Sequence, residues 1–304
     1  MPAEPRNTGP HVPSVHKPVL LREVIRWLDL HPGQVVVDAT VGAGGHSREI
    51  LKSIGPKGIL IGLDRDPMML KFASQTLTAS NCHLRQSSYS ALPEVLRALD
   101  LEHADRVLLD LGLSSDQLAD DQRGFGFESK GPLDLRFDPT SGEPAWQLIE
   151  RLREPELAEI FKTYGEERFS NRIARQIIER RKTNPVRTAA ALIEAVREAI
   201  PRKFQKSAKK HPATRIFQAL RIAVNDELSH LENALNDSIY RSLVSGGRAV
   251  VISFHSLEDR IVKRAFRNSD RWENLTPKPV SATGTEQRMN PRCRTAKLRA
   301  ARKK

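Results

Sequence analysis

Apolar runs that alternate with helical patterns dominate the first third of the chain. A helix is predicted over 18–30, strands over 34–40, 58–64, 82–88 and 104–112, and further helices beginning near His46, Pro67 and Ser90. The runs Val35–Val37 and Val107–Leu109 are continuous, which is typical of strands covered on both faces. This order of elements predicts an α/β fold with a doubly wound sheet.

The next convincing strand, at 246–254, comes only late in the chain. The apolar positions of residues 216–243 fall at helical spacing, so this segment supplies the crossover helix that a parallel connection needs. Residues 114–213 are surplus to that connection, and their periodicity predicts helices over 144–152, 155–164, 168–181 and 188–200. We therefore expect a helical insertion domain at 114–213 within a sheet domain formed by 16–113 and 214–304. The proline-rich segment 1–15 is expected to be a flexible arm.

Cysteine content and hydropathy narrow the class of protein. The two cysteines, Cys82 and Cys293, stand in no metal-ligand spacing, so no metal site is predicted. No apolar run approaches the roughly 20 residues of a membrane helix, and the N-terminus has no secretory h-region. These patterns predict a cytoplasmic protein that does not enter membranes.

The excess positive charge, +12 overall, lies in the last third of the chain. Residues 201–304 hold 23 Lys and Arg against 9 Asp and Glu, whereas the remainder is nearly balanced. This distribution would attract phosphate backbones, although solubility charge explains it equally well. The natural phosphate contacts are Lys203, Lys206, Lys209, Lys210, Arg215, Arg288, Arg292, Arg294, Lys297 and Arg299. Taken singly, each of them is more often a solvated surface charge.

A glycine-rich turn follows the first strand, in the segment Asp38–His46. Its glycines allow a ligand to approach the backbone, and free N–H groups at a helix start favour an anion. A dinucleotide fingerprint would need glycine where Ser47 stands, which argues against a bound pyrophosphate. Asp64 ends the second strand, where a carboxylate can accept both hydroxyls of a ribose. Together these features predict a nucleoside site with a small anion, such as the carboxylate of S-adenosylmethionine; a purely structural turn is the alternative.

Further polar side chains fall where strands end at the same edge of the sheet. Tyr89 follows the third strand, where a ring can stack near an adenine, although ordinary packing is more common. Asp110 closes an apolar strand, and a buried carboxylate there needs a donor from ligand or protein. His255 follows the fifth strand and is a candidate for contact with substrate or a proton. Ser256 and Asp259 fit a capping box, which explains both without any function.

The segments 123–127 and 131–138 are rich in glycine and aromatic residues. They fit a lid over the site that offers aromatic faces to a base. They fit equally well a hydrophobic hinge that packs the insertion on the sheet.

Several sequence blocks, spread over about residues 16–300, stand out together. They are GAGGHS at 42–47, DRD at 64–66, LLDLGLSSDQL at 108–118, RGFGF at 123–127, GPLDLR at 131–136, YGEERF at 164–169, HPATRIFQALRIAVNDEL at 211–228, ISFHSLEDRIVK at 252–263 and NPRCRTAKLR at 290–299. In this order they resemble the RsmH (MraW) family of ribosomal RNA methyltransferases. The resemblance implies a class I S-adenosylmethionine-dependent methyltransferase sheet with a helical insertion.

The resemblance also implies a reaction and its residues. The reaction is methylation of the N4 amino group of a cytidine in the decoding region of 16S rRNA, within the small ribosomal subunit. The implied cofactor contacts are Gly44, Gly45, His46, Asp64, Tyr89, Asp110 and Gln117. The chain lacks the D/N-P-P-Y/F tetrad that many amino-methyltransferases carry after the fourth strand. Asp110 is therefore our candidate for orienting the cofactor or the amino group, with His255 as a second catalytic candidate.

Two other functions fit the same sequence. One is methylation of DNA or a small molecule. The other is an RNA-binding ribosome-assembly factor that has kept the methyltransferase fold and lost turnover, although the pair Gly44 and Asp64 argues against it. The oligomeric state stays open, with a homodimer as one alternative.

Overall fold

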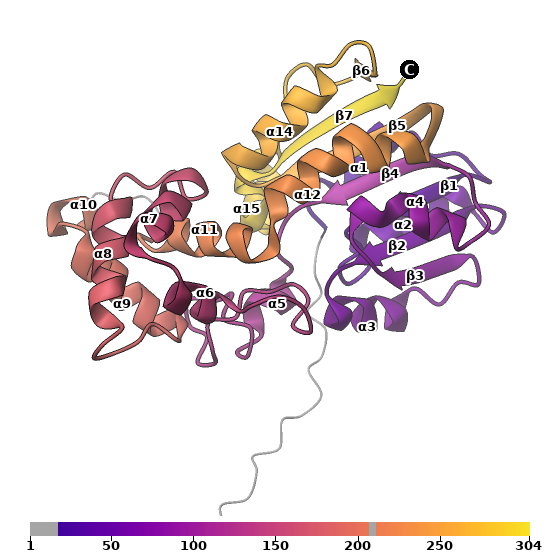
Figure 1. The fold of residues 1–304 in the computed structure, drawn as a ribbon. Coiled ribbons are helices and arrows are strands. Elements are labelled where there is room, and N and C mark those ends of the chain that lie inside the picture. Colours follow the sequence, from indigo (N-terminus) through magenta and orange to yellow (C-terminus); the bar gives the residue numbers. More distant parts are fainter. Residues whose placement is uncertain (1–17, 207–210) are drawn as a thin grey trace, which may run out of the picture.

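A seven-stranded sheet forms the larger part of the molecule (Figure 1). The computed structural model describes residues 18–206 and 211–304. The strands are β1 (Val35–Asp38), β2 (Ile59–Asp64), β3 (Cys82–Gln86), β4 (Ala104–Asp110), β5 (Leu243–Ser253), β6 (Trp272–Asn274) and β7 (Lys297–Lys303), in the order β3-β2-β1-β4-β5-β7-β6. The first five run parallel, and β7 is antiparallel to both of its neighbours. The strand order reverses between β1 and β4, which is where open α/β sheets bind their ligands.

Helices cover both faces of this sheet. One face carries α1 (Leu21–Leu28), α2 (Gly45–Ile54) and α3 (Pro67–Thr76), and the other carries α4 (Leu92–Arg97), α12 (Glu227–Asn233), α13 (Ile239–Ser242) and α14 (Ser256–Phe266). Successive strand residues alternate between the faces, so Val36 packs with α1 and α2 while Val37 packs on the opposite side. The predicted doubly wound α/β fold is confirmed.

A second hydrophobic core lies beside the sheet and is built from helices alone. Its helices are α6 (Ala145–Arg151), α7 (Glu154–Thr163), α8 (Ser170–Arg180), α9 (Ala189–Ala199) and α11 (Thr214–Asn225), flanked by α5 (Ser115–Ala119) and α10 (Arg202–Lys206). Figure 1 shows α6 to α11 grouped at one end of the sheet. The four helices predicted between 144 and 200 are present. Because the core also takes in Ile216 and Leu220 of α11, the domain boundary at 213 stays a prediction.

The predicted crossover helix over 216–243 is broken, so that prediction is wrong in part. Asp226 adopts the left-handed conformation with φ 48°, which ends α11 and starts α12. The chain then passes through a π-helical turn, η2 (Ala234–Ser238), before α13. The break separates two packing roles, because α11 joins the helical core whereas α12 packs on the sheet.

The C-terminal segment belongs to the sheet, which the sequence did not indicate. Arg299 of β7 is only 4% exposed, and its Nε donates to Asp259 Oδ1 at 2.7 Å. Lys297 Nζ donates to the other carboxylate oxygen at 3.1 Å. The prediction that Arg299 contacts phosphate is therefore wrong. The capping box predicted for Ser256 and Asp259 is also wrong, since His255 is the N-cap of α14 and Glu258 its N3 residue.

Removal of the Asp259 carboxylate is expected to cost stability, because it leaves the buried Arg299 charge unpaired. We expect Asp259→Ala to lower the free energy of unfolding by about 3–5 kcal/mol in urea denaturation. Asp270→Ala, at an exposed position, is the control and should change it by less than about 0.5 kcal/mol. A loss below about 1 kcal/mol for Asp259→Ala would show that β7 does not depend on this pair.

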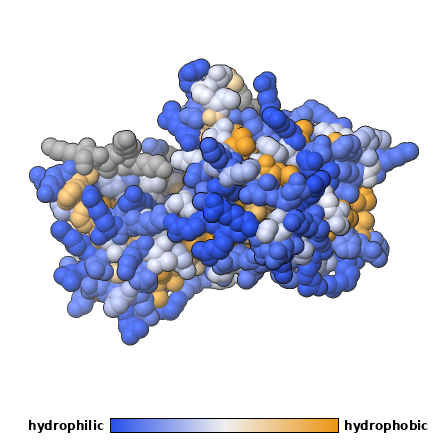
Figure 2. Space-filling view, turned by 90° about the horizontal axis from the view of Figure 1, so that it is seen from above, coloured by the Kyte–Doolittle hydropathy of each residue, from blue (hydrophilic) through white to orange (hydrophobic). Residues whose placement is uncertain are grey.

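The surface is mostly polar. Figure 2 shows one face covered largely by hydrophilic residues, with small separate apolar areas. Lys203, Arg215, Arg288 and Arg294, all predicted phosphate contacts, are exposed. The predicted arm at 1–15, Lys209, Lys210 and the side chain of Lys206 lie outside what the structure describes. Within the described ranges, every helix is too short or too polar to cross a bilayer.

Candidate active site

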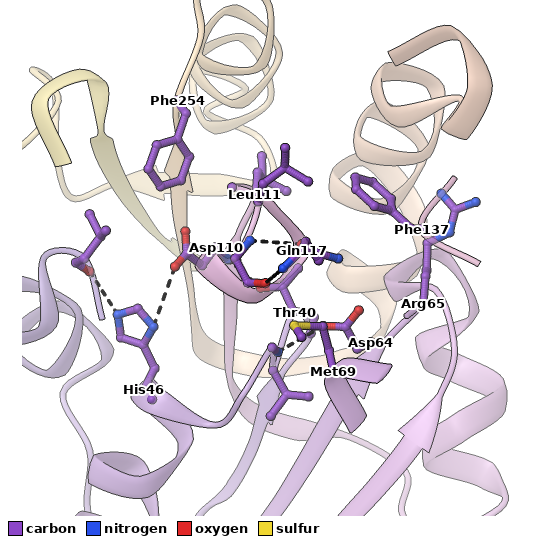
Figure 3. A pocket seen from close by; sticks show the side chains of 18 of the residues that line it. Thr40, His46, Asp64, Arg65, Met69, Asp110, Leu111, Gln117, Phe137 and Phe254 are labelled. Atoms are coloured by element: carbon purple, nitrogen blue, oxygen red, sulfur yellow. Dashed lines mark hydrogen bonds and ion pairs between the residues drawn. The ribbon is translucent and has the colours of Figure 1, made fainter. Parts of the chain in front are cut away.

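A pocket opens at the carboxyl ends of β1, β2 and β4, where the strand order reverses (Figure 3). The empty space between its walls, counted together with the open solvent at its mouth, is about 1130 Å³. Of the predicted site residues, the pocket wall includes Gly45, His46, Asp64, Tyr89, Asp110 and Gln117. Gly44 and His255 do not line it.

The glycine turn shapes one end of the pocket. Gly42 has φ 52° and donates its N–H to Asp64 Oδ2 at 2.9 Å. Gly44 has φ 87° and is the N-cap of α2. A Cβ at Gly44 would lie 3.0 Å from the Leu77 side chain, so glycine is needed there for packing and conformation. Gly44 therefore sets the turn, and Gly42 and Gly45 form the wall.

Asp64 is held so that it can accept two hydroxyls. Its Oδ1 accepts the N–H of Asp66 and its Oδ2 that of Gly42, each at 2.9 Å. Each oxygen keeps a further lone pair. Burial raises the pKa of this carboxyl to about 7. Tyr89, at the start of the 3₁₀ turn after β3, forms the adjacent wall, and burial raises the pKa of its hydroxyl.

Asp110 is the least satisfied acceptor of the pocket. Its backbone N–H donates to Thr40 Oγ1 at 2.6 Å, which fixes the end of β4. Its Oδ2 lies 3.8 Å from Nδ1 of His46, and Figure 3 shows the two side chains pointing toward each other. Its Oδ1 is buried and has no hydrogen-bond partner among the described residues. Burial raises the pKa of the carboxyl to about 7, with the charge of Arg292 acting in the opposite direction.

His46 is locked by the backbone on its other side. Nε2 lies 2.9 Å from the carbonyl oxygen of Val19, which can only accept, so Nε2 carries a proton. Burial lowers the pKa of the imidazole. The ring is therefore neutral near pH 7 and turns its Nδ1 lone pair toward Asp110, which leaves this carboxylate in need of an external donor.

The chain matches the MraW methylase family over residues 13–304. It belongs to this family. A Geotalea uraniireducens protein named ribosomal RNA small subunit methyltransferase H is 44% identical over 95% of this chain and 98% of its own length. A protein of the same name from Rhodopirellula baltica is 46% identical over 95% and 91%, respectively. Among solved structures, an rRNA methylase from Streptococcus thermophilus has 12% identity and a TM-score of 0.39, covering 93% of this chain and 92% of that chain.

Family membership confirms the predicted enzyme class and cofactor, a methyltransferase that uses S-adenosylmethionine. The pocket fits this group on structural grounds. The buried Oδ1 of Asp110 lacks a donor, which an ammonium or sulfonium group nearby would compensate. The free lone pairs of Asp64 suit a ribose diol, and the start of the ten-residue helix α2 suits a carboxylate.

Gln117 connects this methyltransferase pocket to the segment that the sequence marked as a lid or hinge. Its Oε1 accepts the N–H of Ser114 at 2.9 Å and its Nε2 donates to the fully buried Asp66 at 2.8 Å. Asp66 also binds the guanidinium of Arg123 at 3.2 Å. Arg123 in turn donates to the carbonyl of Phe137 at 2.9 Å, so the segment is tied to the end of β2.

The aromatic residues of that segment divide between the two predicted roles. Phe125 is buried in the helical core, and Phe127 packs on His211 and Phe217 with ring centroids 4.7 and 4.9 Å away. These two rings therefore pack in the helical part and do not line the pocket, and the hinge stays a prediction. Phe137 does line the pocket, where it packs near Arg65 (Figure 3).

Asn225, at the end of α11, fixes the position of Phe137. Its Nδ2 donates to the carbonyl of Leu135 and its Oδ1 accepts the N–H of Phe137, both at 2.7 Å. The carbonyl of Asn225 accepts from Arg65 at 2.8 Å. One side chain of the helical core thus holds part of the pocket wall.

Sequence reasoning did not assign several residues of the pocket wall to the cofactor site, among them Phe137, Glu227, Phe254, Glu258 and Arg292. Phe137 was expected only in the lid or hinge segment, and Arg292 only as a phosphate contact. Phe254 and Glu258 follow the fifth strand, so their place at the strand end was a usable signal. Glu227 and Arg292 come from distant segments, and no spacing in the sequence links them to β4.

Phe254 lies against Gly112, directly beyond Asp110. A Cβ at position 112 would come within 2.6 Å of the Phe254 ring. We therefore expect Gly112→Ala to displace this ring and to lower kcat/KM for methyl transfer about tenfold or more, with little loss of stability. The control is Gly284→Ala, because a Cβ there meets nothing within 4 Å. Equal activity of both variants would show that the ring's position is irrelevant.

His255 lies behind the pocket wall. Its Nε2 is 3.0 Å from Glu258 Oε1. Burial acts to raise the pKa of Glu258, but the contacts with His255 and Arg221 outweigh it and the pKa is lowered. Glu227 completes the group and is bound by Arg221 at 2.8 Å. The ligand atoms of Glu227, His255 and Glu258 lie within 4.8 Å of one another, so the prediction of no metal stays untested. His255 has no direct access to the pocket, and its proton-transfer role also stays a prediction.

Proposed function

We propose that this chain transfers a methyl group from S-adenosylmethionine to the N4 amino group of a cytidine in the decoding region of 16S rRNA. Two observations support this proposal. Relatives of nearly the same length are named ribosomal RNA small subunit methyltransferase H. The observation that carries it is the buried, unpartnered Oδ1 of Asp110 at the end of β4, between the glycine turn and Phe254.

The cofactor side of the site is formed by Gly45, His46, Asp64, Tyr89, Asp110 and Gln117. In this proposal Asp64 binds the ribose, Tyr89 lies along the base, and the start of α2 takes the carboxylate. Gly44 acts through the turn and makes no contact of its own. When bound, S-adenosylmethionine supplies an electrophilic methyl group on a positively charged sulfur.

The acceptor side must overcome the weak nucleophilicity of the cytosine amino nitrogen, whose lone pair is delocalised into the ring. A fixed carboxylate can orient that nitrogen and accept a hydrogen bond from it, which makes the nitrogen a better nucleophile. Asp110 and Glu258 are the acceptors on the pocket wall, and Phe254 offers the adjacent aromatic face. The target nucleotide must leave its RNA stack to reach them.

We further propose that the helical part at 114–213 holds the RNA and that the small ribosomal subunit is the physiological substrate, which places the reaction in the cytoplasm. The exposed cation Lys203 of this region and Arg215, directly after it in α11, support RNA contact.

The proposal is tested by offering labelled S-adenosylmethionine with unmodified small ribosomal subunits, protein-free 16S rRNA and DNA. We expect label in the subunits, and N4-methylcytidine after nucleoside digestion and mass spectrometry. Label found only in DNA would show that the substrate is DNA and that the proposed RNA substrate is wrong. Cofactor binding in calorimetry without transfer to any acceptor would instead support an assembly factor.

A further inference from the structure

Arg292 brings a positive charge from the C-terminal segment into the pocket. It lies in the 3₁₀ turn η3 (Pro291–Thr295) and is half-buried on the pocket wall. Its Nη1 donates to Ser115 Oγ at 2.5 Å, at the start of α5. Among residues 18–206 and 211–304, this is the one hydrogen bond of its guanidinium.

The turn that carries Arg292 is firmly anchored. Cys293, within the same turn, and Ala296, directly after it, are buried in the core beneath α1 and α2. The preceding helix, α15 (Gly284–Met289), is joined to the start of α1, where Glu286 Oε1 accepts the N–H of Leu20 at 2.8 Å. Arg292 is therefore a positioned cation and differs from the mobile charges of the surface.

The charge of Arg292 is poorly neutralised. Asp110 and Asp116 are the acids that influence it most, yet it forms no ion pair with any carboxylate in the described part of the chain. Burial lowers the pKa of the guanidinium, and the charges of Asp110 and Asp116 act in the opposite direction. By contrast, the buried Arg299 is fully paired with Asp259. A desolvated guanidinium with unused N–H donors favours an anion that it can bind through two of them.

We propose that Arg292 binds a backbone phosphate of the target nucleotide as its base enters the pocket; this rests on the proposed function. The alternative anion is the carboxylate of the cofactor. That carboxylate already has the N–H groups of the glycine turn and the start of α2, whereas Arg292 is fixed to α5, in the segment after β4. A nucleotide that reaches Asp110 with its base carries its phosphates toward the mouth of the pocket. Arg292 thus couples RNA binding to the site of chemistry.

The test compares Arg292→Gln and Arg292→Lys with the unaltered protein. Binding to unmodified small ribosomal subunits is measured over a salt series, together with kcat, KM and the calorimetric affinity for S-adenosylmethionine. We expect Arg292→Gln to raise KM for subunits about tenfold, to reduce the slope of log affinity against log salt by about 0.7 to 0.9, and to leave cofactor affinity within twofold. Arg292→Lys should keep the slope and lose part of the affinity, because lysine keeps the charge without the planar fork.

The control is Arg241→Gln, at an exposed position on α13 far from the carboxyl ends of the strands, and it should change none of these quantities. A tenfold loss of cofactor affinity with an unchanged salt slope would assign Arg292 to the cofactor carboxylate. A shifted pH profile of kcat with an unchanged salt slope would show that Arg292 acts on the ionisation of Asp110 and not on phosphate. The binding measurement does not depend on turnover. Absence of methyl transfer by the unaltered protein would therefore overturn the proposed function, while the salt slope would still show whether Arg292 binds phosphate. Absence of binding by the unaltered protein would overturn both.

Discussion

Asp110→Asn is expected to lower kcat for methyl transfer by about 10²–10³-fold while the protein remains folded. Asparagine has the same shape, and the hydrogen bond to Thr40 Oγ1 comes from the backbone of residue 110, so the end of β4 is kept. The variant removes the charge that this carboxyl carries when ionised, at the position where Oδ1 has no hydrogen-bond partner among the described residues. The amide of the variant can also turn its own N–H donors toward the donor that substrate or cofactor would bring, so that no hydrogen bond forms between them. Single-turnover rates at saturating cofactor separate this effect from weaker binding.

Asp270→Asn is the control for the charge change, since Asp270 is exposed. Its rate should stay within twofold of the unaltered enzyme. Asp110→Glu keeps the charge but moves it by one methylene. We expect its kcat to lie between those of Asp110→Asn and the unaltered enzyme. A rate for Asp110→Asn within about threefold of the unaltered enzyme would remove Asp110 from the chemistry.

The unliganded protein is expected to become less stable as pH rises from about 4 to about 7. Burial raises the pKa of both Asp64 and Asp110 to about 7, from 3.8 for an ordinary aspartate. Between these values the folded state binds protons that the unfolded state has released, so the free energy of unfolding falls with rising pH. Each group contributes up to about 1.4 kcal/mol per pH unit, and the fall ends once both are ionised above pH 7.

Urea denaturation at several pH values measures this dependence. Asp64→Asn and Asp110→Asn should each make the free energy of unfolding depend less on pH. Because other buried acids also titrate, the quantity to compare is the difference between each variant and the unaltered protein. The pKa of Glu227 is raised too, whereas that of Asp259 is lowered by Arg299 and Lys297 and acts in the opposite sense. The cofactor is a cation and should bind more tightly as pH rises through 7. Parallel stability curves for the variants and the unaltered protein would contradict the assignment of these two groups.

The sequence predicted the parallel half of the sheet because its strands are covered on both faces and are therefore apolar throughout. It did not indicate β7, whose sequence KLRAARK looks like a solvated basic tail. Pairing with β5 buries its alanines, and Asp259 neutralises Arg299, so a charged strand becomes part of the core. Such compensation depends on a residue forty positions away and leaves no local pattern.

The pocket residues likewise divide into those that a local sequence pattern indicates and those that only tertiary packing brings together. Asp64 and Asp110 could be predicted because the carboxyl ends of parallel strands meet at one edge. The sequence marked Phe137 only as part of a lid or hinge and Arg292 only as a phosphate contact. Their approach to that edge could not be predicted, because a loop of the helical part and a turn near the C-terminus reach it only through tertiary packing. His255 was assigned to the same edge by position in the chain, yet its role as N-cap of α14 turns it behind Glu258.

The break at Asp226 makes the two parts of the molecule mechanically dependent on each other. Asn225, the last residue before the break, holds Phe137 on one side and Arg65 on the other. A change in the tilt of α11 would therefore move a wall of the cofactor cleft together with the end of β2. A force that a large substrate exerts on these helices would be transmitted toward the methyl donor through this asparagine.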